Sequence, residues 1–415
     1  PTTSNFGTGL PRRGMGVGPM APSSATLFAF NVGFGDCVLL RFQYADNVRR
    51  HVLIDFGSTR QPKQRPSDYL TRIAHQIRDL CGGKLDIVVA THRHKDHIYG
   101  FRTNLSGTGP GDVIADCDPT LVLQPWTEHP DAATNATEIP QGAAASMHFA
   151  KALSNMDRFS RAIHRLGRQE AARKDFGTRM SKAFSFLGEN NIANKSAVRN
   201  LMTMGHERRY LCFGEDAGTA DILPGVEVDV LGPPTLEQHG DISAQSVQNQ
   251  EEYWHINALA AGASVDAREE APIFPAKHLP FWGRWGRYRL RRLRGDMLMQ
   301  IVRQLDRQMN NTSLILLFTV GNRSLLFPGD AQWENWSYAL SKDDIKQKLK
   351  SVDVYKVGHH GSQRHAEDTM GLVRKSVGNF GNRPPEVVDV HQAWRSWSLS
   401  RNRSPAGDAC RCVEE

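Results

Sequence analysis

The chain has 415 residues, of which 40% are hydrophobic, and this is enough to bury the core of one large domain or of two ordinary ones. Lysine and arginine number 51 against 44 aspartate and glutamate residues, so the formal net charge is +7, which permits an anionic substrate without requiring one. No apolar run reaches the roughly 18 residues that a membrane-spanning helix needs, so we expect no such helix.

Both ends of the chain look irregular. Residues 1–25 are rich in Pro, Gly and Ser without the apolar stretch of a signal peptide, which predicts a disordered arm. Residues 376–415 show no sustained period and predict an irregular tail after a main domain at 26–375. The six cysteines stand mostly apart in apolar stretches, as buried thiols do in a reducing compartment, so we expect a cytoplasmic protein.

The first half of the main domain alternates between strand and helix patterns. Residues 25–45 predict two strands around a Gly-rich turn at 33–36, and "RHVLIDFGS" (50–58) predicts a third. The segment "SDYLTRIAHQIRDLCGG" (67–83) has helical periodicity and ends on glycines. The apolar run "LDIVVA" (85–90) then predicts another strand.

The second half continues with strands around two long polar or helical segments. A helical insertion is expected at about 142–190, where apolar and basic faces alternate. Two apolar runs joined at Gly321 and Asn322 predict a β-hairpin. A further helix is expected at 297–309. The other predicted strands have the sequences "PTLVLQPWTE", "SAVRNLMTM", "RRYLCFGED", "VEVDVLGPP" and "VDVYKVGHHGS".

A dense cluster of ligand-type side chains, "HRHKDH", follows the strand predicted at 85–90. His92 and His94 are two positions apart, and residues at that spacing face the same side of an extended chain, so their imidazoles can converge. Asp96 and His97 come after the strand and can point to a second position close by. Imidazole and carboxylate suit zinc, manganese or iron, and two ions roughly 3.5–4 Å apart would take one pair each. A charged loop without metal is the alternative interpretation.

Two later strand ends carry further ligand-type residues. The sequence "LLFPGDAQ" supplies Asp330, and "DVYKVGHHGS" supplies His359 and His360. Layered α/β folds place their sites at strand ends, so these residues and the cluster predict one coherent site. The alternative interpretation of Asp330 is a surface turn residue.

The order of these motifs resembles that of the metallo-β-lactamase fold hydrolases. The likeness rests on H-x-H-x-D-H, on Gly-Asp after a strand, and on "FNVGFGDCVLL", "LIDFG" and "KVGHHGS". Within that superfamily, the sequences "NVGFGD", "LLFPGDA" and "KVGHHGS" are most similar to those of the ComEC-like nuclease and phosphodiesterase branch. The resemblance covers roughly residues 26–365 and implies an α/β fold, an αββα sandwich with a helical insertion.

By position, the resemblance also implies a site of two divalent ions, zinc or manganese. His92 and His94 would bind one ion, and Asp96, which catalysis would require, and His97 would bind the second. Asp330 would bridge the two ions.

The resemblance implies roles for three further residues. We prefer His360 as the last ligand of the second ion, which leaves His359 as a catalytic residue that donates a proton or hydrogen bond to the scissile group. Asp55 matches a strand-end acid that supports the ligand loop. Asp216 in "CFGEDAG" is the alternative to Asp330 as the bridge, although no "GHHGS" follows it.

The family pattern usually has another histidine between the cluster and the bridging aspartate. His129 directly follows a predicted strand, and His278 lies closer to Asp330 along the chain, so the choice stays open. The other histidines in this interval are His148, His164, His206, His239 and His255.

The substrate is suggested by the basic aromatic segment at 282–308. Its opening, "WGRWGRYRLRRLRG", interleaves arginines with Trp and Tyr, and arginine pairs with phosphates while aromatic rings stack on bases. We expect Arg287, Arg291 and Arg292 to contact an anionic substrate. A solvated basic element that packs its aromatic rings inward is the alternative interpretation.

Phosphodiester hydrolysis by a metal-activated hydroxide is the function that these features favour. No Walker A loop, dinucleotide fingerprint or serine nucleophile elbow is present, which argues against those chemistries. Two alternatives remain: a hydrolase of small molecules such as a cyclic nucleotide, lactone or lactam, and an inactive metal-binding module that binds a partner. The expected partner is a nucleic acid or nucleotide and not a membrane.

Overall fold

The computed structural model describes residues 2–7, 21–62, 64–129, 195–235, 237–239, 309–358 and 386–388. The chain divides into two units, one of Pro1–His129, Lys195–Ile242 and Asn310–Glu415, the other of Pro130–Asn194 and Ser243–Met309. All the strands and helices named below belong to the first unit. The helical insertion expected at 142–190 and the basic aromatic segment expected at 282–308 lie outside the described residues.

The first sheet has seven strands in the order β1-β2-β3-β4-β5-β6-β7 and is mixed. Strands β1 to β4 pair antiparallel, whereas β4 to β7 pair parallel, so the carboxyl ends of β4, β5 and β6 meet at one edge. The strands are β1 Thr2–Gly7, β2 Ser24–Ala29, β3 Cys37–Gln43, β4 Arg49–Phe56, β5 Ile87–Val89, β6 Leu121–Pro125 and β7 Glu207–Leu211.

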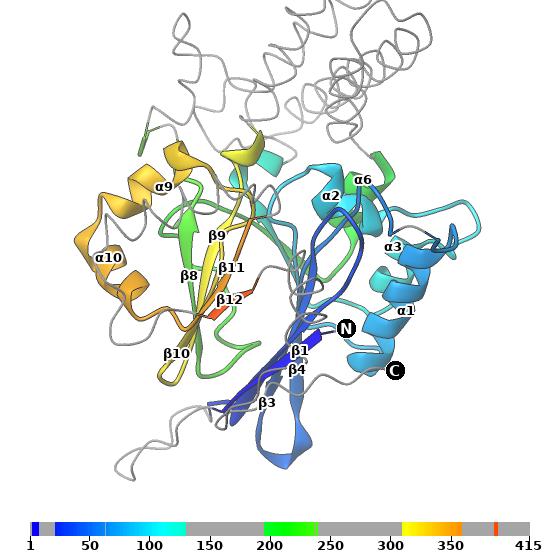
Figure 1. The fold of residues 1–415 in the computed structure, drawn as a ribbon, viewed down its shortest axis with the longest axis horizontal. Helices are drawn as coiled ribbons and strands as arrows, with labels where there is room; N and C mark the ends of the chain where they lie inside the picture. Colours follow the sequence, from blue (N-terminus) through cyan, green and yellow to red (C-terminus); the bar gives the residue numbers. More distant parts are fainter. Residues whose placement is uncertain are drawn as a thin grey trace, which may run out of the picture. The chain divides into compact units, whose positions relative to one another are not determined.

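Helices and short turns of helix connect these strands. In Figure 1, α1, α3 and α6 lie on the side of the first sheet that faces away from the second sheet. The helices are α1 Tyr69–Leu80, α2 Lys95–Ile98, α3 Pro110–Ala115 and α6 Lys195–Thr203, with 3-10 turns η1 Ala45–Asn47, η2 Tyr99–Phe101 and η3 Trp126–Glu128.

The second sheet is also mixed, with five strands in the order β12-β11-β10-β9-β8. Its antiparallel part is β8, β9 and β10, and β11 and β12 add parallel strands beside β10. The strands are β8 Val226–Gly232, β9 Ile315–Val320, β10 Arg323–Phe327, β11 Val354–Lys356 and β12 Glu386–Val388, and the helices are α9 Trp333–Leu340 and α10 Asp343–Lys350.

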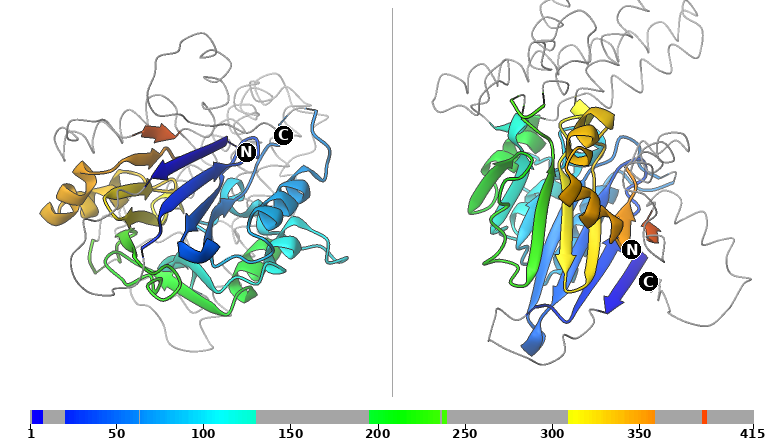
Figure 2. Two further views of the ribbon diagram at one scale, coloured as in Figure 1. Left: turned by 90° about the horizontal axis from the view of Figure 1, so that it is seen from below. Right: turned by 90° about the vertical axis from the view of Figure 1, so that its left-hand side faces the viewer.

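The two sheets share one hydrophobic core, and the views of Figure 2 show them face to face. Alternate residues of β2 to β6 and of β8 to β10 enter this core, as the two-residue period of a strand requires. The ring centroids of Phe42 and Phe318 lie 6.4 Å apart within it. The opposite face of the second sheet packs on α9 and α10 through Trp336 and Leu349. The order is therefore helices, sheet, sheet, helices.

Most of the predicted strands and the helix at 67–83 are confirmed. The interpretation of 196–204 as a strand is wrong, because these residues form the helix α6. Ala197, Val198 and Leu201 are buried at a helical spacing. The buried Asn200 side chain also donates to the backbone oxygens of Phe101 and Gly111, at 2.9 and 3.0 Å, and this tertiary anchor is invisible in the local pattern.

Each of the two chain ends contains one described strand. Thr2–Gly7 forms β1 and pairs with β2, although the composition of residues 1–25 predicts a disordered arm. Glu386–Val388 forms β12 beside β11, within the tail predicted to be irregular. Both strands sit on sheet edges, where a neighbouring strand supplies the hydrogen-bonding groups whatever the side-chain pattern of the added segment. Among the described residues, none of the helices has the length and apolar character needed to span a membrane.

Candidate metal centre

The candidate site lies where the carboxyl ends of β4, β5 and β10 meet. After β5, residues 90–94 run without regular structure and lead into the short helix α2. The backbone N–H of Leu314, just before β9, donates to the Thr91 carbonyl at 2.9 Å, which joins the second sheet to this loop. The Asp330 N–H donates to Ser313 Oγ at 3.3 Å, so the turn after β10 is fixed beside the same loop.

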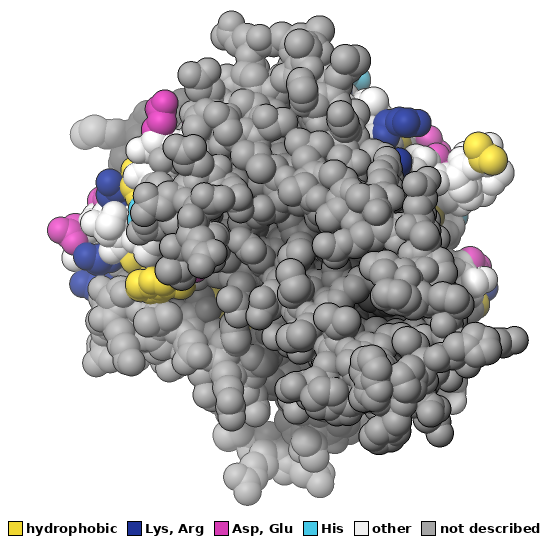
Figure 3. Space-filling model, turned by 90° about the horizontal axis from the view of Figure 1, so that it is seen from above, with side chains coloured by type: hydrophobic (Ala, Val, Ile, Leu, Met, Phe, Trp, Pro, Cys, Tyr) yellow, Lys and Arg dark blue, Asp and Glu magenta, His cyan; other side chains and the backbone are white. Residues whose placement is uncertain are grey.

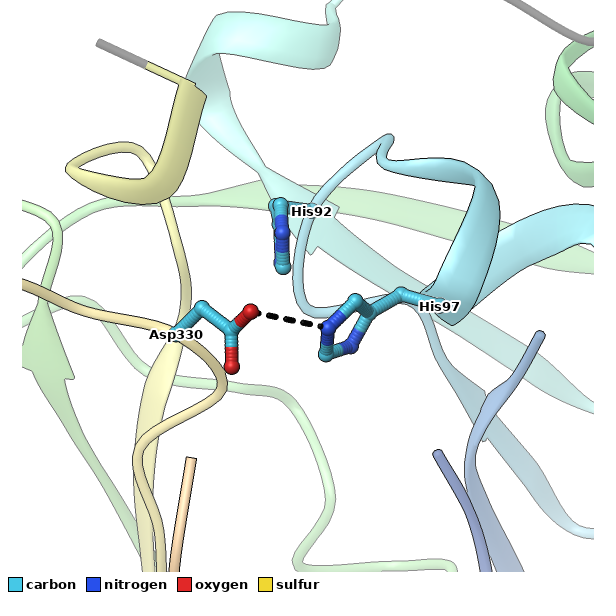
Figure 4. Close-up of side chains that lie close together, drawn as sticks. All are labelled: His92, His97 and Asp330. Atoms are coloured by element: carbon cyan, nitrogen blue, oxygen red, sulfur yellow. Dashed lines mark hydrogen bonds and ion pairs between the residues drawn. The ribbon is translucent and has the colours of Figure 1, made fainter. Parts of the chain in front are cut away.

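Imidazoles and one carboxylate converge in this place. Figure 4 shows His92, His97 and Asp330 turned toward one another, and one ligand atom from each lies within 4.8 Å of the others. His97 Nε2 is 3.2 Å from Asp330 Oδ2. His92 Nε2 is 2.9 Å from His94 Nδ1. Two nitrogens bound to one tetrahedral ion lie roughly 3.3 Å apart, so these spacings suit metal ligands.

Hydrogen bonds behind the cluster fix which ring nitrogen each histidine presents. Thr91 donates its N–H to Asp55 Oδ1 and its hydroxyl to Asp55 Oδ2, each at 2.7 Å. The Thr91 oxygen, having given its hydrogen away, accepts from His92 Nδ1 at 3.3 Å. His97 Nδ1 lies 2.8 Å from Asp55 Oδ2 and donates to it. His97 therefore turns Nε2 toward Asp330, and His92 turns Nε2 toward His94 Nδ1. This use of Nδ1 toward an outer partner is the arrangement that outer carboxylates impose on metal-binding histidines.

A second cluster lies on the opposite side of the His97 ring. Asp36, Asp55 and His97 Nδ1 form a group close enough to hold a cation. Asp36 Oδ2 is 3.8 Å from His97 Nδ1, and it also pairs with the ammonium of Lys356, the last residue of β11. Asp36 and Lys356 are both buried.

The electrostatics of the site follow from these charges in a dry environment. Burial lowers the pKa of His97, but Asp330 and Asp55 raise it, and the resulting pKa lies well above the usual range of histidine. Burial likewise lowers the pKa of Lys356, but Asp36 and Asp330 raise it above the usual range of lysine. An ion that binds His97 must displace a proton, so metal affinity should fall as the pH falls.

A buried ion pair supports the ligand loop from the other side. Arg93 stands between His92 and His94 in sequence, and its Nε donates to both carboxylate oxygens of Glu128, at 2.9 and 2.8 Å. Glu128 ends the 3-10 turn after β6, and the side chains of Arg93 and Glu128 are 2% and 6% exposed. Such a pair satisfies its own charges and fixes the loop to the next strand along the sheet.

Close backbone packing holds α2 against β4. A Cβ atom added at Gly57 would fall on the backbone of Asp96 and His97, well inside the 3.0 Å that real Cβ atoms keep. The Gly57 N–H donates to the Asp36 carbonyl and the Asp36 N–H to the Asp96 carbonyl, each at 2.9 Å. Glycine at position 57 is therefore needed for the loops bearing Asp36 and Asp96 to touch.

The predicted ligands have different outcomes. The structure brings His92, His94, His97 and Asp330 together, and it buries Asp96 on α2 beside them. The remaining predicted site residues lie outside the described residues: His359, His360, Arg287, Arg291 and Arg292.

The alternatives that the sequence left open are not members of the two groups of described residues that could hold a metal ion. Asp216 is exposed and accepts from the Gly218 N–H, so it is a turn residue and not the bridge. The ring of His129 meets that of Tyr210 edge to face, with centroids 4.7 Å apart, and the exposed side chains of His206 and Asp118 form an ion pair. His239 bonds Ser337 Oγ at 3.0 Å. The other candidates, His278 among them, lie outside the described residues.

Sequence reasoning missed three residues that shape the site. Thr91 could have been noticed from its position directly before H-x-H. Asp36 ends the glycine-rich turn, and Lys356 precedes "VGHH". Neither local sequence pattern predicts that these two residues form an ion pair. Comparison with protein-family models gives no match for this chain, and comparison with curated proteins gives none either. The assignment of the site therefore rests on its geometry.

We predict that Asp55→Asn lowers metal affinity by about 10–100-fold, the usual effect of removing an outer-shell partner. The asparagine amide cannot accept from Thr91 and His97 as both carboxylate oxygens do. A chelator competition titration measures the change. Asp79→Asn is the matched control, since the Asp79 side chain is 73% exposed. Equal affinity in Asp55→Asn and the wild type would contradict the role given to Asp55.

Proposed function

We propose that the protein is a metal-dependent hydrolase of the metallo-β-lactamase type that cleaves phosphodiester bonds. The observation that carries the proposal is the buried convergence of His92, His97 and Asp330 from both sheets. The two face-to-face sheets and the order of the motifs along the chain support the same class.

The chemistry of the donor set fits a divalent cation. Among the described residues, the carboxylates of Asp36, Asp55, Asp96 and Asp330 are buried, and the charges of Asp36, Asp330 and Asp55 act on the buried ammonium of Lys356. Such a surplus of buried negative charge is unfavourable unless a cation or bound protons offset it. The ligands that would hold an ion are His92, His94, His97 and Asp330, with Asp96 and His360 as the further members expected from the sequence.

The residues of the chain would prepare this site for hydrolysis. A bound divalent ion supplies Lewis-acid polarisation of the scissile group and activation of water. Asp55 keeps His92 and His97 in the tautomer that presents Nε2, directly for His97 and through Thr91 for His92. Asp330 offers a carboxylate oxygen beside His97 Nε2. His359 would donate a proton or hydrogen bond to the leaving group.

The preference for a phosphodiester rests on charge and on the arginine segment. The net charge of +7 is compatible with an anionic substrate, and the arginines from 284 to 294 are interleaved with Trp285 and Tyr288. On the face shown in Figure 3, the basic and acidic side chains of the described residues lie interspersed, so they form no block of one sign there. We expect the arginine segment to bind a polyanion because arginines pair with phosphates and the aromatic rings beside them can stack on bases.

A matched activity screen tests the proposal. The full chain, loaded with manganese or zinc, should hydrolyse a chromogenic phosphodiester and one or more of single-stranded DNA, duplex DNA and RNA. The Asp330→Asn variant should not. Turnover of cyclic nucleotides or a lactam alone would favour a small-molecule hydrolase. Metal binding without turnover of any of these substrates would contradict the hydrolase and leave a metal-binding interaction module.

We predict that the triple change of Arg287, Arg291 and Arg292 to alanine weakens nucleic-acid binding and flattens its salt dependence. Each arginine that pairs with a phosphate releases a counterion, so the slope of affinity against salt should fall by about 1 for each such arginine replaced. Filter binding across a salt series measures the slope. Hydrolysis of the chromogenic phosphodiester should survive, because the metal ligands are unchanged. Wild-type binding at every salt concentration would make the segment structural.

A further inference from the structure

A second group of possible metal ligands lies on the Nδ1 side of His97. Asp36, Asp55 and His97 present two carboxylates and one imidazole nitrogen, a set that resembles a second metal site. The hydrogen bonds around them decide whether an ion can enter.

Most of the ligand capacity of this second cluster is already taken by hydrogen bonds and by the ammonium of Lys356. Both oxygens of Asp55 accept from Thr91, and Oδ2 also faces His97 Nδ1 at 2.8 Å. A neutral imidazole that offers Nε2 as a lone pair carries its proton on Nδ1, so this nitrogen of His97 cannot also bind a metal. Asp36 is the remaining carboxylate, and the ammonium of Lys356 is seated on its Oδ2.

Lys356 is built into this position. Its side chain is 5% exposed, and that of Asp36 is 4% exposed. The residue ends β11 in the second sheet, whereas Asp36 lies in the turn between β2 and β3 of the first. Asp36 is further tied by backbone hydrogen bonds to Gly57 and Asp96. The ion pair therefore connects both sheets directly behind the ring of His97.

We propose that the ammonium of Lys356 is the resident cation of the Asp36–Asp55–His97 cluster, so that divalent metal binds on the Nε2 side of His97 only. In this role Lys356 and Asp36 are positioning residues. They neutralise a carboxylate next to His97 and hold the turn that packs against the start of α2. The inference rests on the proposed metal-dependent function and adds to it which of the two clusters takes the metal.

The test counts divalent ions bound per full-length chain, by elemental analysis and by chelator competition. Asp36→Asn keeps Lys356 and should bind as many ions as the wild type, with affinity lowered by about tenfold as for an outer-shell partner. Lys356→Met leaves Asp36 without its buried cation, so this variant should bind one additional ion in the place of the ammonium, where Asp36 and the second lone pair of Asp55 Oδ1 can coordinate it. The double variant Asp36→Asn with Lys356→Met removes both charges and should return to the wild-type number.

The variants separate this inference from the proposed function. Loss of one ion in Asp36→Asn would show that Asp36 is a metal ligand and overturn the inference, even if Lys356→Met fails to fold. Wild-type number and affinity in both single variants would overturn it too. His92→Ala tests the proposed function independently, since the ions must be lost there if the first cluster binds metal. A wild-type chain without bound ions would overturn both proposals.

Discussion

Asp330→Asn should abolish metal-dependent hydrolysis and lower metal affinity by more than about 100-fold, beyond the upper range for an outer-shell residue. Asp330 is the carboxylate that reaches the histidine cluster from the second sheet, and its Oδ2 lies 3.2 Å from His97 Nε2. Asparagine keeps the size of the side chain but replaces one anionic oxygen with an amide nitrogen, which does not bind zinc or manganese well. The fold should persist, because the change removes charge and no apolar volume.

Isothermal titration with metal and the chromogenic phosphodiester assay measure the two effects of Asp330→Asn. Asp344→Asn serves as the control, because Asp344 is an exposed aspartate in the first turn of α10. The control should match the wild type in both assays. If Asp330→Asn retains wild-type affinity and turnover, the convergence of Asp330 with His97 has no part in metal binding.

Gly57→Ala should destabilise the fold by about 3 kcal/mol, the upper end of the usual effect of overpacking. The added methyl would overlap the backbone of Asp96 and His97, and backbone atoms cannot rotate away as a flexible side chain can. The start of α2 must therefore move from β4, which also displaces His97 from Asp55. Urea unfolding measures the first effect, and metal titration below the unfolding transition measures the second.

Gly107→Ala separates steric overlap from backbone strain. Gly107 has φ of +67° and nothing within 4 Å of an added Cβ, so its replacement brings strain without a clash. The expected destabilisation is about 1 kcal/mol. If Gly57→Ala is no more destabilised than Gly107→Ala, the packing between β4 and α2 is looser than the structure indicates.

The parts of the site that the sequence predicted are those with a local signal. His92 and His94 share a side because of their spacing after a strand, and Asp330 follows a glycine after another strand. Both features depend on the strand period and on the rule that sites gather at strand ends. The succession of strands along the first half of the chain was also predictable, because each apolar run is short and bounded by turn residues.

The parts that the sequence did not predict depend on interactions between distant segments. Lys356 and Asp36 are 320 positions apart. The sequence around Lys356 predicts an ordinary strand end, and that around Asp36 predicts an ordinary turn. Residues 196–204 resemble a strand because their apolar run is short, whereas the buried Asn200 anchors a helix to Phe101 and Gly111. The strands β1 and β12 form because sheet edges accept them, and no periodicity in either segment requires it.

Anomalous diffraction from crystals of the full chain grown with zinc would show whether the cluster of His92, His97 and Asp330 binds a metal ion. The metal-edge difference map should contain a peak at about 2.0–2.2 Å from His92 Nε2, with Asp330 as a further ligand. The Nδ1 side of His97, where Asp36 and Lys356 pair, should contain none. Absence of a peak at the first cluster, in crystals that bind zinc elsewhere, would contradict the account.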